Sequence, residues 1–174
     1  MIVRHEETDR DPAERLGDRI CAAALRSIEQ LEGNFTFEDV ADRAGTSVDE
    51  VTACCHNSRT KLVLDVYGMH TWRMSEVLKY APYDGNAEAA LRHFVYSLCG
   101  LLAAAPVFLD ALKSDKGSEE HVYDFVATVC ELLYEDAEEK GATVSLILYG
   151  FIDRFSSMVS EGTDPALTLL EALR

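Results

Sequence analysis

No hydrophobic stretch in this chain approaches the roughly 18 to 20 residues that a membrane-spanning helix needs. The N-terminal segment, residues 1 to 12, is rich in charge and lacks the apolar centre of a signal peptide. We therefore expect a cytoplasmic protein with no membrane partner. Only four prolines occur, and we find no β-hairpin signal and no internal repeat.

The chain also lacks the cysteine spacing of a metal or redox motif. It has five cysteines, an odd number, and none forms a C-x-x-C pair. The run Cys54-Cys55-His56 admits two interpretations, a metal or thiol sensor, or one core cysteine beside a surface cysteine and a polar histidine. Adjacent helical residues point about 100° apart, and no further ligand lies nearby at a zinc-site spacing. We favour the second interpretation and predict no metal and no cofactor.

Signatures of catalysis are absent as well. The sequence contains no G-x-S-x-G elbow, no H-E-x-x-H pair and no phosphate-cradling glycine loop. We predict that the protein is not an enzyme.

Basic residues are few. Thirty-one acidic residues oppose sixteen basic ones, which gives a formal net charge of −15. Nucleic-acid-binding proteins usually present a basic patch, because phosphate neutralisation supplies much of their affinity. Any interpretation that involves DNA must account for this charge.

Helical periodicity is what the chain has in abundance. Apolar residues recur at spacings of three and four from residue 14 until Gly33-Asn34. Thr36 with Asp39, and Ser47 with Glu50, then predict two short capped helices separated at Gly45. Two short helices joined by a tight, glycine-containing turn are typical of a helix-turn-helix.

The remaining sequence predicts further helices and no strands, so the expected fold class is all-α. We expect helices over residues 59–80, 86–105 and 106–113, then over about 119–140 and 143–160 with Gly141 between them. A last short helix is expected to end at Arg174.

The stretch FTFEDVADRAGTS, the helix before it and the pair Ser58-Arg59 after it together resemble the start of TetR-family regulators. SLILYGFIDRF, EGTDP and LTLLEAL are similar to the usual end of such chains. The resemblance covers nearly the whole chain, with its specific motifs in residues 14 to 62.

The resemblance implies a flexible arm at 1–12, a helix-turn-helix domain at 13–60, and a ligand-binding and dimerisation domain at 61–174. It implies a homodimer formed through the two long helices at about 119–140 and 143–160. It also implies a cavity for a small apolar ligand, whose binding alters the spacing of two DNA-reading heads. Such heads engage successive major grooves about one helical turn apart.

Candidate site residues fall into two groups. DNA contacts are predicted for side chains that suit base edges or phosphates: Thr36, Arg43, Ser47, Thr52, His56, Asn57, Arg59 and Lys61. The arm residues Arg4 and Arg10 could add to them. Aromatic, histidine and methionine side chains that suit an apolar pocket, or alternatively plain core packing, are Met69, His70, Trp72, Met74, His93, Phe94, Tyr123 and Phe125.

Two functions remain open. The first is a TetR-like repressor whose DNA binding is controlled by a small molecule. The second is the same scaffold without DNA binding, acting through protein–protein interaction. The segment SVDEVTACCHN favours the second, because it contains Asp49 and Glu50 but no lysine or arginine.

Overall fold

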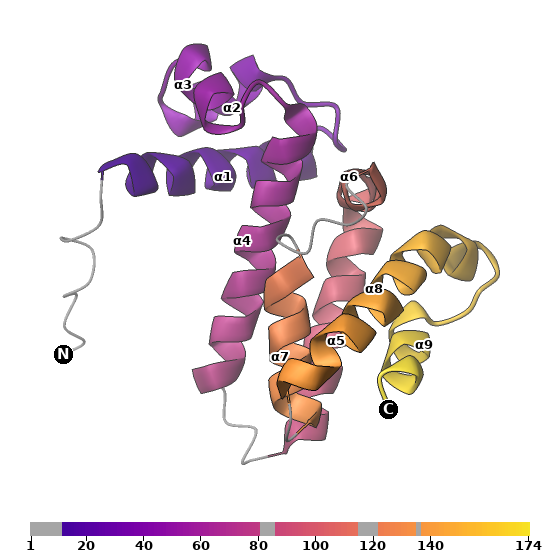
Figure 1. Ribbon diagram of the computed structural model, residues 1–174. Coiled ribbons are helices and arrows are strands. Elements are labelled where there is room, and N and C mark those ends of the chain that lie inside the picture. Colours follow the sequence, from indigo (N-terminus) through magenta and orange to yellow (C-terminus); the bar gives the residue numbers. More distant parts are fainter. Residues whose placement is uncertain (1–11, 81–85, 115–121, 135–136) are drawn as a thin grey trace. The chain divides into compact units, whose positions relative to one another are not determined.

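The computed structural model describes residues 12–80, 86–114, 122–134 and 137–174 (Figure 1). Within these ranges the chain forms nine α-helices and no strand, which confirms the all-α prediction. The chain divides into two compact units, Met1–Val66 and Tyr67–Arg174. The division predicted from the sequence lay between residues 60 and 61. The arm residues 1–11 lie outside the described residues, whereas Pro12 already belongs to the first helix.

The first unit contains three helices and the start of a fourth. These are α1 (Pro12–Gln30), α2 (Phe37–Ala44), α3 (Val48–Cys54) and the beginning of α4 (Arg59–Tyr80). α2 packs against both α1 and α3, and Figure 1 shows α1 running beneath these two short helices. The expected order of helix, turn and helix is confirmed.

A small apolar core holds the first unit together. Its fully buried members come from all four helices and from the loop before α2: Ile20, Ala24, Ile28, Phe35, Val40, Ala41, Val51, Cys55, Leu62 and Val63. The periodicity of α1 and the short apolar faces of α2 and α3 therefore point inward as predicted. α2 and α3 are too short to be stable alone, so this packing and their caps keep them folded.

The second unit begins within α4 and contains five further helices. They are α5 (Ala87–Ala104), α6 (Pro106–Ser114), α7 (Tyr123–Leu133), α8 (Ala137–Ser160) and α9 (Pro165–Ala172). α5 packs against α6, α7 and α9, while α8 packs against α6, α7 and α9. Large side chains fill the centre, and the rings of Phe94 and Phe125 stack with their centroids 5.2 Å apart.

The predicted break at Gly141 is wrong. Gly141 lies inside α8, and the preceding helix, α7, ends at Leu133. Tyr134 leaves the helical conformation at φ −127° and ψ 138°. Glycine inside a helix costs only about 1 kcal/mol relative to alanine. At Gly141 a Cβ atom would lie 3.9 Å from Cγ1 of Val126 on α7, so the two helices approach closely here.

Among the described residues, no single helix has the length and apolar character that crossing a membrane requires. α5 and α6 meet that requirement only as a pair, and they are bent by 97° relative to each other.

Candidate nucleic-acid interface

The turn between α2 and α3 is a short, fully hydrogen-bonded reversal. Gly45 adopts the left-handed conformation, φ 62° and ψ 47°, which favours glycine because it lacks a Cβ atom. The Gly45 N–H donates to the carbonyl of Asp42 at 3.4 Å, and the Thr46 N–H donates to that of Ala41 at 3.1 Å. These bonds satisfy carbonyls at the end of α2 and fix where α3 begins.

Both predicted capping boxes are present. At α2, the Asp39 carboxylate accepts from the backbone N–H and the hydroxyl of Thr36, at 2.7 and 3.0 Å. At α3, Glu50 Oε2 accepts from the backbone N–H of Ser47 at 3.0 Å, from its hydroxyl at 2.8 Å and from the Thr46 hydroxyl at 2.5 Å. The bonds from Thr46 and Ser47 lower the pKa of Glu50 to about 2. The ionised Glu50 carboxylate is therefore part of the cap of α3.

Arg19 on α1 makes a contact with this turn that sequence reasoning missed. Its Nη2 atom donates to the carbonyl of Ala44 at 2.8 Å and to that of Gly45 at 3.2 Å. The guanidinium also adds to the lowering of the pKa of Glu50. No local sequence signal indicates this contact, because the bonded residues are 25 and 26 positions away along the chain.

Four of the predicted DNA-contacting residues lie on α3 or in the turns on either side of it. Ser47 caps the helix, and the Thr52 hydroxyl donates to the Asp49 carbonyl at 3.0 Å. His56 and Asn57 are exposed and adopt positive φ angles of 51° and 56°. Asparagine and histidine are among the residues that most readily take this conformation, which turns the chain towards α4.

The predicted phosphate-binding residues differ in whether other groups of the chain already occupy their donors. Thr36 lies at the N-terminus of α2, but its backbone N–H and its hydroxyl both donate to the Asp39 carboxylate. Arg43 is exposed near the end of α2. Arg59 instead donates to the Gly33 carbonyl and lies 4.6 Å above the Phe35 ring, and the Lys61 ammonium lies 2.8 Å from the Asp65 carboxylate. The structure therefore holds Arg59 and Lys61 in intramolecular contacts.

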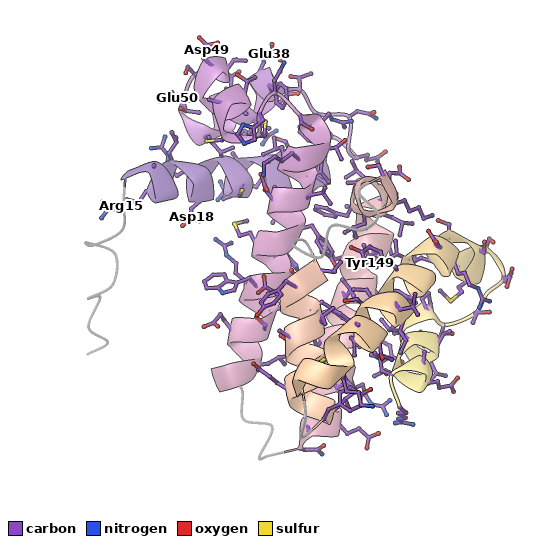
Figure 2. All side chains as sticks on the ribbon, in the orientation of Figure 1. Arg15, Asp18, Glu38, Asp49, Glu50 and Tyr149 are labelled. Atoms are coloured by element: carbon purple, nitrogen blue, oxygen red, sulfur yellow. The ribbon has the colours of Figure 1, made fainter. Side chains whose placement is uncertain are left out.

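The surface of α2 and α3 is acidic. Across these helices there is one basic residue, Arg43, against five acidic ones: Glu38, Asp39, Asp42, Asp49 and Glu50. The carboxylates of Asp39 and Glu50 are held in the caps and stay charged, whereas those of Glu38, Asp42 and Asp49 are exposed and take no part in a cap. Figure 2 shows Glu38 and Asp49 at the outer edge of the first unit, on the side of α2 and α3 away from α1.

The predicted ligand-contacting residues are scattered within the second unit. Phe94 and Phe125 are fully buried against each other, whereas Trp72 and Tyr123 are 43% and 67% exposed. Met69, His70 and Met74 are half-buried on α4, and His93 is exposed on α5. The structure thus brings Phe94 and Phe125 together in the core and leaves the two exposed rings on the surface.

Two surface hollows of the second unit have different linings. One of about 510 Å³ lies along α5 and includes His93, and beside it the Tyr96 hydroxyl donates to Asp164 at 3.2 Å. The other, of about 260 Å³, lies between α8 and α9 and includes Leu146, Gly150 and Arg154. Of the predicted ligand residues, only His93 lines either hollow.

The five cysteine thiols differ in how deeply they are buried. Cys54 is exposed and Cys55 is buried, as predicted. Burial raises the pKa of Cys21 to about 12, with Asp65 and Asp18 adding to the effect, and burial likewise raises the pKa of Cys99 to about 12. In the described part of the chain, no group of three or more histidine, cysteine or acidic side chains is arranged to hold a metal ion.

Comparison of the chain with models of known protein families found no match, and a search among curated proteins likewise found none.

Proposed function

We propose that the chain is a transcriptional regulator of the TetR type, whose first unit binds duplex DNA through α3 and the turn that follows it. The observation that carries the proposal is the pair α2–α3: two short helices, each closed by a full capping box and joined by a left-handed Gly45. A helix held this firmly and exposed on its outer side suits insertion into a major groove.

The side chains available on this surface define how it reads DNA. Thr52, His56 and Asn57 supply donors and acceptors for base edges, and Arg43 supplies a phosphate contact. Because few cations take part, we expect few released counterions and a shallow dependence of affinity on salt. Specificity then depends more on base contacts than on charge.

Regulation by a small apolar molecule bound in the second unit belongs to the same proposal. The hydroxyl of Tyr67 is fully buried, and it has no hydrogen-bond partner in the described structure. Buried polar groups normally have one. An apolar ligand with one acceptor atom within reach of Tyr67 supplies that partner. Thermal-shift screening of the wild-type protein and of Tyr67→Phe tests this, since the ligand should stabilise the wild type more than the variant.

A homodimer completes the proposal, and α8 is its natural surface. Leu146 on α8 is 75% exposed, and Val159 and Leu167 are about half exposed on α8 and α9. Leu146 also lines the hollow between α8 and α9, and an exposed apolar side chain beside a hollow is typical of an interface. Leu146→Glu should convert a dimer into a monomer in sedimentation analysis, and an unchanged mass would exclude this face.

Titration of the protein with labelled duplex tests the DNA-binding function. The proposal predicts that Asn57→Gly, which keeps the positive φ of this position, and Thr52→Ala weaken binding to the preferred sequence and leave binding to random duplex unchanged. Thr60→Ala, at an exposed position of α4, serves as the control.

A second function is favoured by the outward charges Glu38, Asp42 and Asp49. In this alternative the acidic surface of the first unit binds a basic surface of a partner protein and does not bind DNA. Replacing Asp42 and Asp49 by lysine should abolish partner binding in this case, but strengthen binding to random duplex if the head binds DNA. Glu50 is unsuitable for this test, because its replacement removes the cap of α3.

A further inference from the structure

We propose that Arg19 is a positioning residue: from α1 it fixes the start of α3 relative to the end of α2, and thereby sets the sequence preference of the head. This inference rests on the proposed DNA-binding function. The geometry that carries it is one guanidinium nitrogen shared between two consecutive carbonyls of the turn, those of Ala44 and Gly45.

The two carbonyls lie at the C-terminal end of α2. The carbonyl of Ala44 belongs to the final residue of α2, and that of Gly45 belongs to its left-handed cap. Both stand at the negative end of the α2 dipole, which a cation stabilises. A planar guanidinium holds its donors in a fixed direction, so the contact restricts the orientation of the turn as well as its position.

The same guanidinium acts on the start of α3. It lies close enough to the Glu50 carboxylate to favour its charged form, and that carboxylate accepts from Thr46 and from Ser47, the N-cap residue. One side chain of α1 therefore acts on both sides of the turn. Loss of Arg19 removes both hydrogen bonds to the turn and so loosens the restraint on the orientation of α3 against α2.

A tilt of α3 affects the two kinds of DNA binding differently. Base-edge hydrogen bonds depend on the direction of each side chain, whereas attraction to phosphates depends mainly on charge. Loss of a positioning contact therefore reduces specific binding and spares non-specific binding. Loss of a phosphate contact reduces both, and lowers the slope of log affinity against log salt by about 0.9.

The test compares Arg19→Gln and Arg19→Lys with Arg26→Gln. Arg26 lies on the same helix, is exposed, and loses the same charge in its variant. We expect Arg19→Gln to reduce the ratio of specific to random-duplex affinity about tenfold, because two hydrogen bonds are lost. Arg19→Lys should recover only part of this ratio, and Arg26→Gln should leave it unchanged. The salt slope should stay unchanged in Arg19→Gln.

Amide hydrogen exchange without DNA separates this inference from the proposed function. In Arg19→Gln, the amides of Gly45, Thr46 and Ser47 should exchange several-fold faster, while α1 remains protected. Equal exchange in wild type and variant overturns the positioning role, whether or not the protein binds DNA. Faster exchange together with a uniform loss of specific and random-duplex affinity, and a lower salt slope, also overturns it. Faster exchange in a protein that binds no duplex supports the restraint of α3 but refutes the DNA-binding function.

Discussion

Removal of the α3 cap by Ser47→Ala should loosen α3 while the other helices remain intact. The Ser47 hydroxyl accepts from the Glu50 N–H at 3.2 Å and donates to the Glu50 carboxylate at 2.8 Å. Alanine at an N-cap costs about 1 kcal/mol, within a range of about 0.5 to 2. α3 has only seven residues, so this loss is large relative to its local stability.

Hydrogen exchange measured residue by residue is the suitable assay, because opening of α3 exposes its amides without unfolding the whole unit. A cost of about 1 kcal/mol corresponds to roughly fivefold faster exchange in α3. Ser156→Ala, at an exposed position inside α8, is the control and should leave stability unchanged or slightly higher. Exchange rates in α3 that equal those of the wild type would refute the argument that the cap holds this helix.

Three further predictions concern pH, thiols and packing. Hydrogen bonds from Thr46 and Ser47 lower the pKa of Glu50 from 4.5 to about 2, so its carboxylate stabilises the fold above about pH 4.5 and loses this effect as the pH falls towards 2. Acid unfolding of Glu50→Ala should therefore be less steep than that of the wild type over this range; parallel curves would contradict the assignment. A thiol reagent should modify exposed Cys54 first and reach Cys99, whose pKa burial raises to about 12, only on unfolding. Equal modification rates would contradict the described burial. Phe94→Ala should lower the free energy of unfolding by about 3 to 5 kcal/mol in urea titrations, because the ring is buried against Phe125. A change below about 1 kcal/mol would show that the stacked pair lies outside the core.

Local sequence signals predicted the helices of the first unit well. The two capping boxes, the glycine stop and the positions of α2 and α3 each depend on residues at most four positions apart, so the sequence alone specifies them. The start of α4 at Arg59 was likewise confirmed, because Asn57 and Ser58 interrupt the periodicity just before it.

Contacts between distant residues were beyond such reasoning. Arg19 meets the turn, and Arg59 meets Gly33, only after the helices have packed. The break expected at Gly141 failed for a related reason, since tertiary contact with α7 outweighs the low helix propensity of glycine. Composition could not separate core rings such as Phe94 and Phe125 from surface rings such as Trp72.

The contacts in the structure also distinguish the two acidic residues of α3 from each other. Sequence alone gave Asp49 and Glu50 the same weight against DNA binding. In the structure Glu50 is a structural cap, while Asp49 faces outward. Glu50 stays ionised and exposed, so both residues keep their negative charge, but only Asp49 can be replaced without removing the cap.

The most direct test of the central claim is titration of the protein against duplex from its own upstream region and against random duplex, at low and moderate salt. The proposed regulator predicts tight binding that prefers the upstream sequence and loses this preference in Asn57→Gly, which keeps the backbone conformation of the turn. Absence of binding even at low salt would contradict DNA recognition and direct the search to a protein partner with a basic surface.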